Sequence, residues 1–244
     1  MQYTRYRART FYSNYFPPGV KWLIVANCVV FVLQQLASGR LTEWFGLVPG
    51  LIRYHGFIWQ LFTYMFLHGG IWHLVINMLM LWMFGADLER DWGTRKFMQY
   101  YFLCGVGAGL CVIVASYLFG GVMSRTIGSS GAIYGLLLAF GMLYPDRIVL
   151  MSFLFPIKAK YFVFIMGAIA FLSSFQANTG VSDVAHLGGM LFGFLYLKTK
   201  LTRRPVNPLG GLRDQYRNWQ RQRAKKKFQV YLRRHGSDRD RWVN

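Results

Sequence analysis

Charged residues are scarce in this chain of 244 residues, and acidic ones are the scarcest, with 9 Asp and Glu against 28 Lys and Arg. Charged residues make up 15% of the sequence, compared with about a quarter in soluble domains, whereas hydrophobic residues reach 54%. This balance argues against a soluble domain and favours the bilayer as the solvent. The basic residues behind the net charge of +19 are expected to lie outside the hydrocarbon.

Cysteine is also rare. Cys28, Cys104 and Cys111 are an odd set within apolar segments, so we interpret them as small buried hydrophobes rather than disulfides or metal ligands. No metal or cofactor is expected. The N-terminus lacks a short apolar stretch that ends in a small-residue cleavage site, so the first hydrophobic run is predicted to be a retained span.

Six predominantly apolar stretches predict membrane-spanning helices at 22–37, 59–85, 97–119, 130–144, 161–177 and 184–199. The predicted fold is therefore all-α, a six-helix polytopic membrane protein. The stretch 147–157 is apolar as well, but its short length and Pro156 favour an interfacial segment over a seventh span.

Six spans place both termini on one side, and the basic residues select that side. Of the Lys and Arg residues, 25 lie on the side of the termini and 3 on the other, namely Arg40, Arg53 and Arg125. The positive-inside rule then predicts cytoplasmic termini. The expected organisation is a basic N-terminus (1–21), a membrane core (22–199) and a basic tail (200–244), in a bacterial plasma (inner) membrane.

The tail carries a basic cluster at Arg221, Arg223 and 225–227. Such a cluster beside a span is attracted to anionic lipids, although a role in orientation and solubility alone is an equal alternative. No nucleic-acid-binding signature accompanies it, so no nucleic acid partner is expected.

The segment 128–132, Gly-Ser-Ser-Gly-Ala, opens the fourth predicted span. Ser130 would sit at a helix N-terminus, where free backbone N–H groups suit an oxyanion. Gly128 and Gly131 would allow a substrate backbone to approach closely. Alone, this motif is more often a simple helix cap.

His186 lies about one turn inside the sixth predicted span, where an ionisable residue is a functional candidate. Gly189 and Gly193 follow it on the same helical face. They permit close packing against Gly131 and Gly135 of the fourth predicted span, which have the same spacing. That packing would bring His186 within hydrogen-bond reach of Ser130 and activate the hydroxyl. A histidine that only bonds across a helix interface is the alternative.

His73 and Asn77 are four residues apart on one face of the second predicted span. Both side chains can donate hydrogen bonds, as an oxyanion hole requires, or can simply join helices. His68, one turn nearer the outer end, is expected to bridge to a loop or to water.

Together these segments resemble the rhomboid family of intramembrane serine proteases, over about 22–198. The resemblance implies Ser130 as nucleophile, His186 as general base, and an oxyanion hole of His73, Asn77 and the Ser130 backbone N–H. It also implies that Tyr134 packs on the catalytic histidine. Glu89 resembles the family's structural acidic residue at the end of the second helix.

One departure is Gln60, which follows Trp59 where the family often shows Trp-Arg. Asp183 precedes His186 by three residues, but Val181-Ser182-Asp183 is interpreted as the N-cap of the sixth span. The catalytic unit is therefore predicted to be a Ser–His dyad.

The predicted function is a serine endopeptidase that cleaves single-span or polytopic membrane proteins near the outer leaflet. The alternatives are a catalytically silent relative that binds membrane clients for quality control, and a small proton-coupled transporter. The transporter would show an inverted repeat, which the sequence lacks.

Overall fold

The computed structural model describes residues 16–151, 155–175 and 180–202. Packing divides the chain into one unit of Met1–Lys198 and a second of Thr199–Asn244, of which only the first four residues are described. The basic cluster predicted to meet lipid heads therefore lies outside the described residues.

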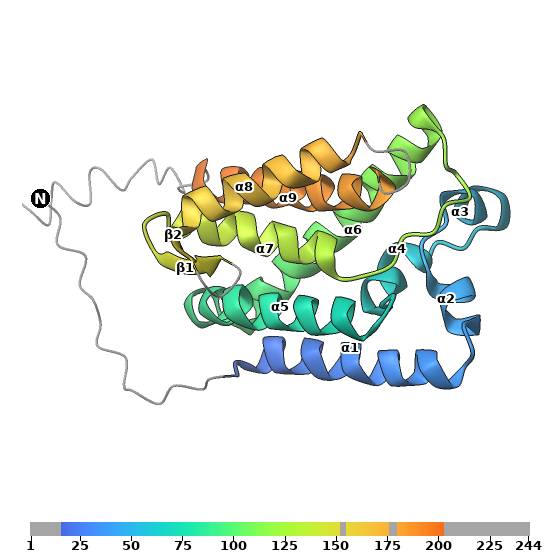
Figure 1. The fold of residues 1–244 in the computed structure, drawn as a ribbon, viewed down its shortest axis with the longest axis horizontal. Coiled ribbons are helices and arrows are strands. Elements are labelled where there is room, and N and C mark those ends of the chain that lie inside the picture. Colours follow the sequence, from blue (N-terminus) through green and yellow to red (C-terminus); the bar gives the residue numbers. More distant parts are fainter. Residues whose placement is uncertain (1–15, 152–154, 176–179, 203–244) are drawn as a thin grey trace, which may run out of the picture. The chain divides into compact units, whose positions relative to one another are not determined.

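Helices make up most of the described chain (Figure 1). The long ones are joined by short helices and one hairpin. In chain order the elements are α1 (Pro18–Leu36), α2 (Arg40–Phe45), α3 (Pro49–His55), α4 (Gln60–Thr63), the 3₁₀ helix η1 (Tyr64–Phe66), α5 (Ile71–Trp92), α6 (Thr94–Phe119), α7 (Ser130–Leu143), β1 (Ile148–Met151), β2 (Phe155–Lys158), α8 (Ala159–Ser173) and α9 (Gly180–Thr202).

Within the described residues, α1, α5 and α6 are long and apolar enough to cross a membrane, and α7 and α8 are apolar but shorter. Large apolar side chains face outward from these helices. Trp72 and Phe164 are each 75% exposed and Phe119 is 86% exposed. An outer surface of this kind is stable only where lipid replaces water. The chain is an integral, multi-pass membrane protein.

The interior is aromatic at its centre. Tyr64, Tyr100 and Tyr101 are fully buried among α5, α6 and α7, and Tyr64 Oη donates to the Gly105 carbonyl oxygen at 2.7 Å. A second cluster, built on Phe84, Phe140 and Phe162, packs α8 against α5 and α7. α7 is thus surrounded by other helices, which is why a helix of 14 residues can be central.

The predicted second span at 59–85 was wrong at its start, because α5 begins only at Ile71. The short helices α4 and η1 come first, and η1 ends just before Leu67, whose backbone is extended. Buried Gln34 of α1 binds the turn: it accepts from the His68 backbone N–H at 3.1 Å and donates to the His68 carbonyl oxygen at 2.9 Å. Hydropathy does not detect such a break.

The all-α prediction was also wrong at 148–158, where β1 and β2 form an antiparallel hairpin that pairs Ile148 with Lys158 and Val149 with Ile157. Pro156 excludes a helix there, yet it is tolerated in a two-stranded ribbon, where each strand has one unpaired edge. At its base, Lys158 and Lys160 donate to Asp146 and hold the pKa of this carboxyl below its usual range.

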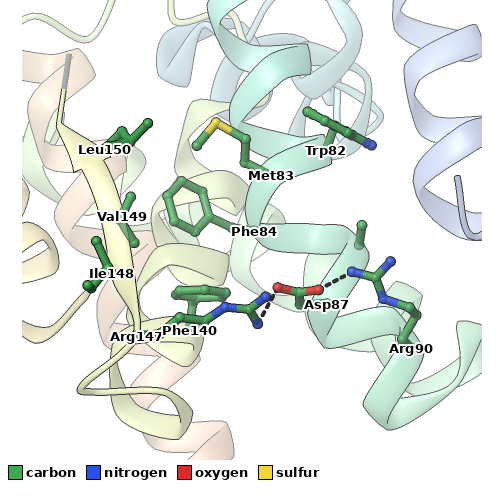
Figure 2. Close-up of a pocket in the computed structure, with 11 residues that line it drawn as sticks. Trp82, Met83, Phe84, Asp87, Arg90, Phe140, Arg147, Ile148, Val149 and Leu150 are labelled. Carbon is green, nitrogen blue, oxygen red and sulfur yellow. Dashed lines mark hydrogen bonds and ion pairs between the residues drawn. The ribbon is translucent and has the colours of Figure 1, made fainter. Parts of the chain in front are cut away.

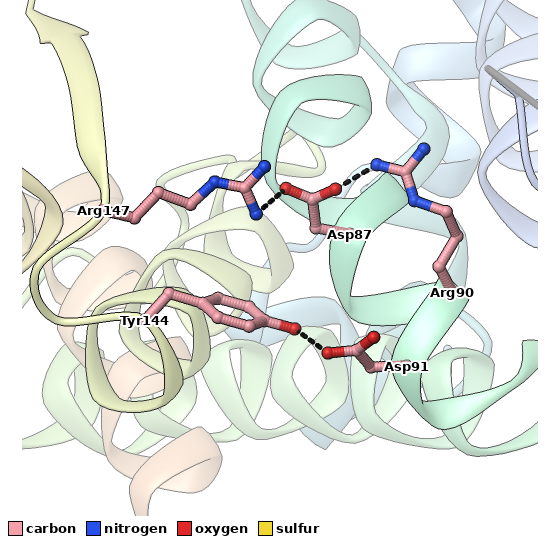
Figure 3. A network of polar contacts seen from close by, with 5 residues as sticks. All are labelled: Asp87, Arg90, Asp91, Tyr144 and Arg147. Carbon is pink, nitrogen blue, oxygen red and sulfur yellow. Dashed lines mark hydrogen bonds and ion pairs between the residues drawn. The ribbon is translucent and has the colours of Figure 1, made fainter. Parts of the chain in front are cut away.

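Side chains of the hairpin, α5 and α7 line a cleft of about 420 Å³ (Figure 2). At its charged end Asp87 lies between two guanidinium groups and pairs with both Arg90 and Arg147, the latter at 2.5 Å (Figure 3). Beside this pair Tyr144 Oη donates to Asp91. These contacts tie the end of α7 and the start of the hairpin to α5.

Glu89 is a buried carboxylate that joins α5 to the start of α1. It accepts from the backbone N–H groups of Gly19 and Val20, both at 2.8 Å, and from Thr94 Oγ1 at 2.6 Å. The first N–H groups of a helix have no partner inside the helix, and Pro17 offers α1 no side-chain cap. Glu89 lies in α5, and its carboxylate therefore caps the N-terminus of α1.

We expect Glu89→Ala to destabilise the protein by about 2–3 kcal/mol, because it strands two buried N–H groups and leaves a cavity. Thermal unfolding in detergent, compared with Glu89→Gln, measures this loss. The glutamine keeps the volume and one acceptor oxygen, so its loss should be smaller. Equal stability of Glu89→Ala and wild type would contradict the capping role.

Candidate active site

Ser130 is the first residue of α7, and the turn before it is built by backbone geometry. Gly128 has φ +121°, a conformation that favours glycine, and its N–H donates to the Tyr64 carbonyl oxygen at 2.9 Å. Ser129 follows in a helical conformation and is fully buried. Ser130 thus stands where the helix presents free N–H groups.

The side chains of Ser130 and His186 meet across 56 residues of sequence. Ser130 Oγ lies 2.8 Å from His186 Nε2, which is hydrogen-bond distance. The Tyr134 ring, one turn further along α7, stacks on the imidazole with ring centroids 4.2 Å apart and planes within 7°. The ring therefore has its plane fixed by Tyr134 and one nitrogen directed at Ser130.

Small residues allow α7 and α9 to come this close. A methyl group at Gly189 would overlap the Gly131 carbonyl oxygen, and one at Gly131 would lie 3.2 Å from the Ala185 carbonyl oxygen. Gly135 meets the Gly189 carbonyl oxygen in the same way, at 3.1 Å. Gly193 differs from the prediction: it lies against the Tyr100 hydroxyl of α6, because α9 contacts both helices.

His73 and Asn77 approach the same turn from the first half of α5. The Gly69 backbone N–H donates to His73 Nδ1 at 3.3 Å, so a neutral His73 carries its proton on Nε2. A methyl group at Gly128 would lie 3.0 Å from that Nε2 and 3.9 Å from Asn77 Nδ2. Two side-chain donors therefore converge on the backbone just before Ser130.

The amide nitrogen of Asn77 is buried, and among the described residues it has no hydrogen-bond partner. A buried donor without a partner is costly and calls for an explanation. An oxyanion that forms only during a reaction would supply the missing acceptor.

His68 does not bridge to a loop in the way expected. Its backbone is bound by Gln34 of α1, and its buried ring packs edge-on against His73 at 5.1 Å between centroids. Gln34 was missed at the sequence level, although a glutamine in an apolar span was a signal. Its effect is to hold the segment that carries Gly69 and hence the His73 ring.

Gln60 also has a definite place in the structure. The side chain is fully buried; it accepts from the Val48 backbone N–H at 3.0 Å and donates to the Trp44 carbonyl oxygen at 3.2 Å. The neutral amide thus holds the chain between α2 and α3 without the charge of an arginine.

Asp183 is not the N-cap that was predicted, because α9 begins at Gly180 and Asp183 lies within its first turn. Its Oδ1 is 3.4 Å from His186 Nδ1. The helix starts earlier than the apolar pattern indicated, since Gly180 to Asp183 is too polar to register in a hydropathy scan.

The helical membrane fold agrees with comparisons to known proteins. The Rhomboid domain model matches residues 55–203. Putative rhomboid protease YdcA of Bacillus subtilis is 29% identical over 180 residues, which are 73% of this chain and 86% of that protein. Rhomboid protease GluP of the same organism is 32% identical over 182 residues, 72% of this chain and 34% of GluP.

A eukaryotic relative is similar as well. Rhomboid protein 1, mitochondrial, of Saccharomyces cerevisiae is 33% identical over 134 residues, 54% of this chain. The chain spans about a third of the length of this relative and of GluP. Since the domain match covers more than half of the chain, the protein belongs to the rhomboid family. Members of this family are mostly intramembrane serine proteases.

Proposed function

We propose that this protein is an intramembrane serine endopeptidase that cleaves the membrane segments of other proteins. The observation that carries the proposal is the 2.8 Å contact of Ser130 Oγ with His186 Nε2. A serine hydroxyl is a weak nucleophile until an adjacent base accepts its proton, and this geometry meets that requirement.

In the proposed reaction Ser130 Oγ attacks the scissile carbonyl carbon while His186 Nε2 takes the hydroxyl proton. The oxyanion accepts hydrogen bonds from His73 Nε2, Asn77 Nδ2 and the Ser130 backbone N–H. His186 then gives its proton to the departing amine, and the acyl-enzyme forms. Water, deprotonated by the same nitrogen, attacks the ester and releases the carboxylate product with Ser130 restored.

The substrate must expose a carbonyl group to Ser130. In a regular transmembrane helix the carbonyl groups are bonded within the helix, so we propose that the substrate unwinds locally and favours small or helix-breaking residues there. The proposed topology has six spans with both termini in the cytoplasm and cleavage near the outer leaflet. At about 1.5 Å per residue, the 14 residues of α7 span less than the bilayer, which supports a reaction site below its surface.

Reconstitution of the wild-type protein into vesicles with a single-span reporter tests this function. Cleavage within the reporter's membrane segment, located by product mass, is the expected result. Binding of the reporter without cleavage would contradict it and favour the quality-control alternative.

We expect Asn77→Ala to lower kcat by about 10²- to 10³-fold, the usual loss for one oxyanion-hole donor, with little change in KM. The side chain bonds the transition state and not the ground state, so binding should persist. Rates in the reconstituted assay measure the loss.

Asn27→Ala is the matched control. Asn27 is also a buried asparagine in a membrane helix, but its amide donates to the Leu23 carbonyl oxygen of α1. This variant should alter stability and leave kcat within about twofold. If the two variants lose kcat equally, Asn77 is not an oxyanion donor.

A further inference from the structure

The Ser130 contact occupies one nitrogen of the His186 ring, and the other nitrogen, Nδ1, needs a partner of its own. If Nε2 accepts the serine proton, a neutral imidazole must carry its own hydrogen on Nδ1. The side chain of His186 is only 18% exposed, so this N–H is largely withdrawn from water. It needs an acceptor, because an unpaired buried donor is costly.

The surroundings of the ring restrict the choice of acceptor. Tyr134 covers a face of the imidazole with its own ring, and Ser130 occupies the Nε2 edge. Asp183 stands at the Nδ1 edge, with Oδ1 3.4 Å away and its side chain 15% exposed. Among the described residues, the ion pair that Asp183 forms is the one with His186.

The place of Asp183 in α9 explains the contact. Residues i and i+3 are neighbours on a helix surface, and α9 extends back to Gly180, so both Asp183 and His186 are inside the helix. An N-cap residue would instead direct its side chain at the backbone N–H groups of the first turn. A carboxylate in this turn also stabilises the helix by interacting with its dipole. The experiment must therefore separate this effect on the helix from an effect on the His186 ring.

We propose that Asp183 is a positioning residue that holds the Nδ1 hydrogen of His186 and stabilises the imidazolium formed when Ser130 is deprotonated. This rests on the proposed protease function and extends the predicted dyad by a carboxylate. The proton moves from Ser130 Oγ to His186 Nε2 and on to the leaving amine, and Asp183 remains ionised. The 3.4 Å distance between Asp183 Oδ1 and His186 Nδ1 is longer than that of a formed hydrogen bond. We expect this distance to shorten once the ring is charged.

Three variants of the 244-residue chain in vesicles test the role: Asp183→Ala, Asp183→Asn, and Asp183→Val combined with Val184→Asp. The combined variant keeps a carboxylate in the first turn of α9 but moves it off the face of His186. We expect Asp183→Ala and the combined variant to lose kcat by about 10- to 100-fold with KM little changed, below the ~10⁴-fold loss of a fully formed triad. Asp183→Asn removes the charge that stabilises the imidazolium, and its amide can hold the wrong tautomer of His186, so it should lose at least as much.

Wild-type kcat in Asp183→Ala would overturn the positioning role and leave the protease function intact. Wild-type kcat in the combined variant would overturn it too, because a charge near the helix terminus would then suffice. A second readout is independent of cleavage: ¹⁵N NMR of the His186 ring should show the Nδ1–H form in wild type and a mixture in Asp183→Ala. Identical spectra would overturn the proposal even if the wild-type protein does not cleave.

Discussion

Replacing Ser130 by alanine is expected to reduce cleavage of a membrane reporter to background, a loss on the order of 10⁴- to 10⁶-fold in kcat. The hydroxyl oxygen of Ser130 is the atom that forms the acyl-enzyme. Among the described residues, it is the hydroxyl that contacts His186 Nε2. The serine side chain is small, so the variant should fold and bind substrate as wild type does.

His186→Ala should lose nearly as much, and the double variant should lose no more than either single one. Residues that act as one unit give non-additive losses, since the first removal already abolishes the step that both serve. Rates of the four proteins in one vesicle preparation measure this coupling. Additive losses would mean that Ser130 and His186 act separately.

Ser116→Ala is the matched control for Ser130→Ala. Ser116 is likewise a serine in a membrane helix, and it is buried in α6. Its replacement should leave cleavage unchanged within about twofold. Cleavage by Ser130→Ala at the rate of this control would exclude Ser130 as the nucleophile.

Gly189→Ala is expected to lower both the stability of the protein and its activity. Its methyl group would overlap the Gly131 carbonyl oxygen, and this atom belongs to the backbone of α7, so no side chain can rotate away. Overpacking of this kind costs about 1–3 kcal/mol or more. If α9 moves outward by about 1 Å, the Ser130–His186 contact opens and kcat falls by about 10²-fold.

Gly167→Ala of α8 tests whether this effect is specific. Its added methyl would meet only the flexible end of Met190, at 3.3 Å, and alanine favours a helix over glycine. Thermal unfolding in detergent and kcat in vesicles should both remain near wild type for this control. Wild-type values for Gly189→Ala as well would show that close helix packing does not set the active geometry.

Hydropathy and charge were sufficient to predict a multi-pass membrane protein, because the cost of burying charge in lipid acts on every stretch of sequence independently. The same local signals failed where one residue decides the path of the chain. Gln34 binds the His68 backbone in the turn before α5, which begins only at Ile71. Such contacts join residues far apart in the sequence, which a hydropathy scan does not connect.

Motif spacing and the resemblance of the sequence to a family indicated four candidate site residues: Ser130, His186, His73 and Asn77. Their distances were decided by tertiary packing, since the approach of α9 to α7 depends on Gly131, Gly135 and Gly189 meeting across the interface. The proton on His73 follows from the Gly69 N–H.

Residue order along the chain thus settled the kind of protein and the candidate residues, because solvent preference and residue chemistry are local properties. Only the folded structure showed that the cap assigned to Asp183 was wrong and that its carboxylate faces His186 Nδ1. The physical reason is that a helix boundary and the direction of a side chain depend on packing, and packing joins residues that the sequence keeps apart.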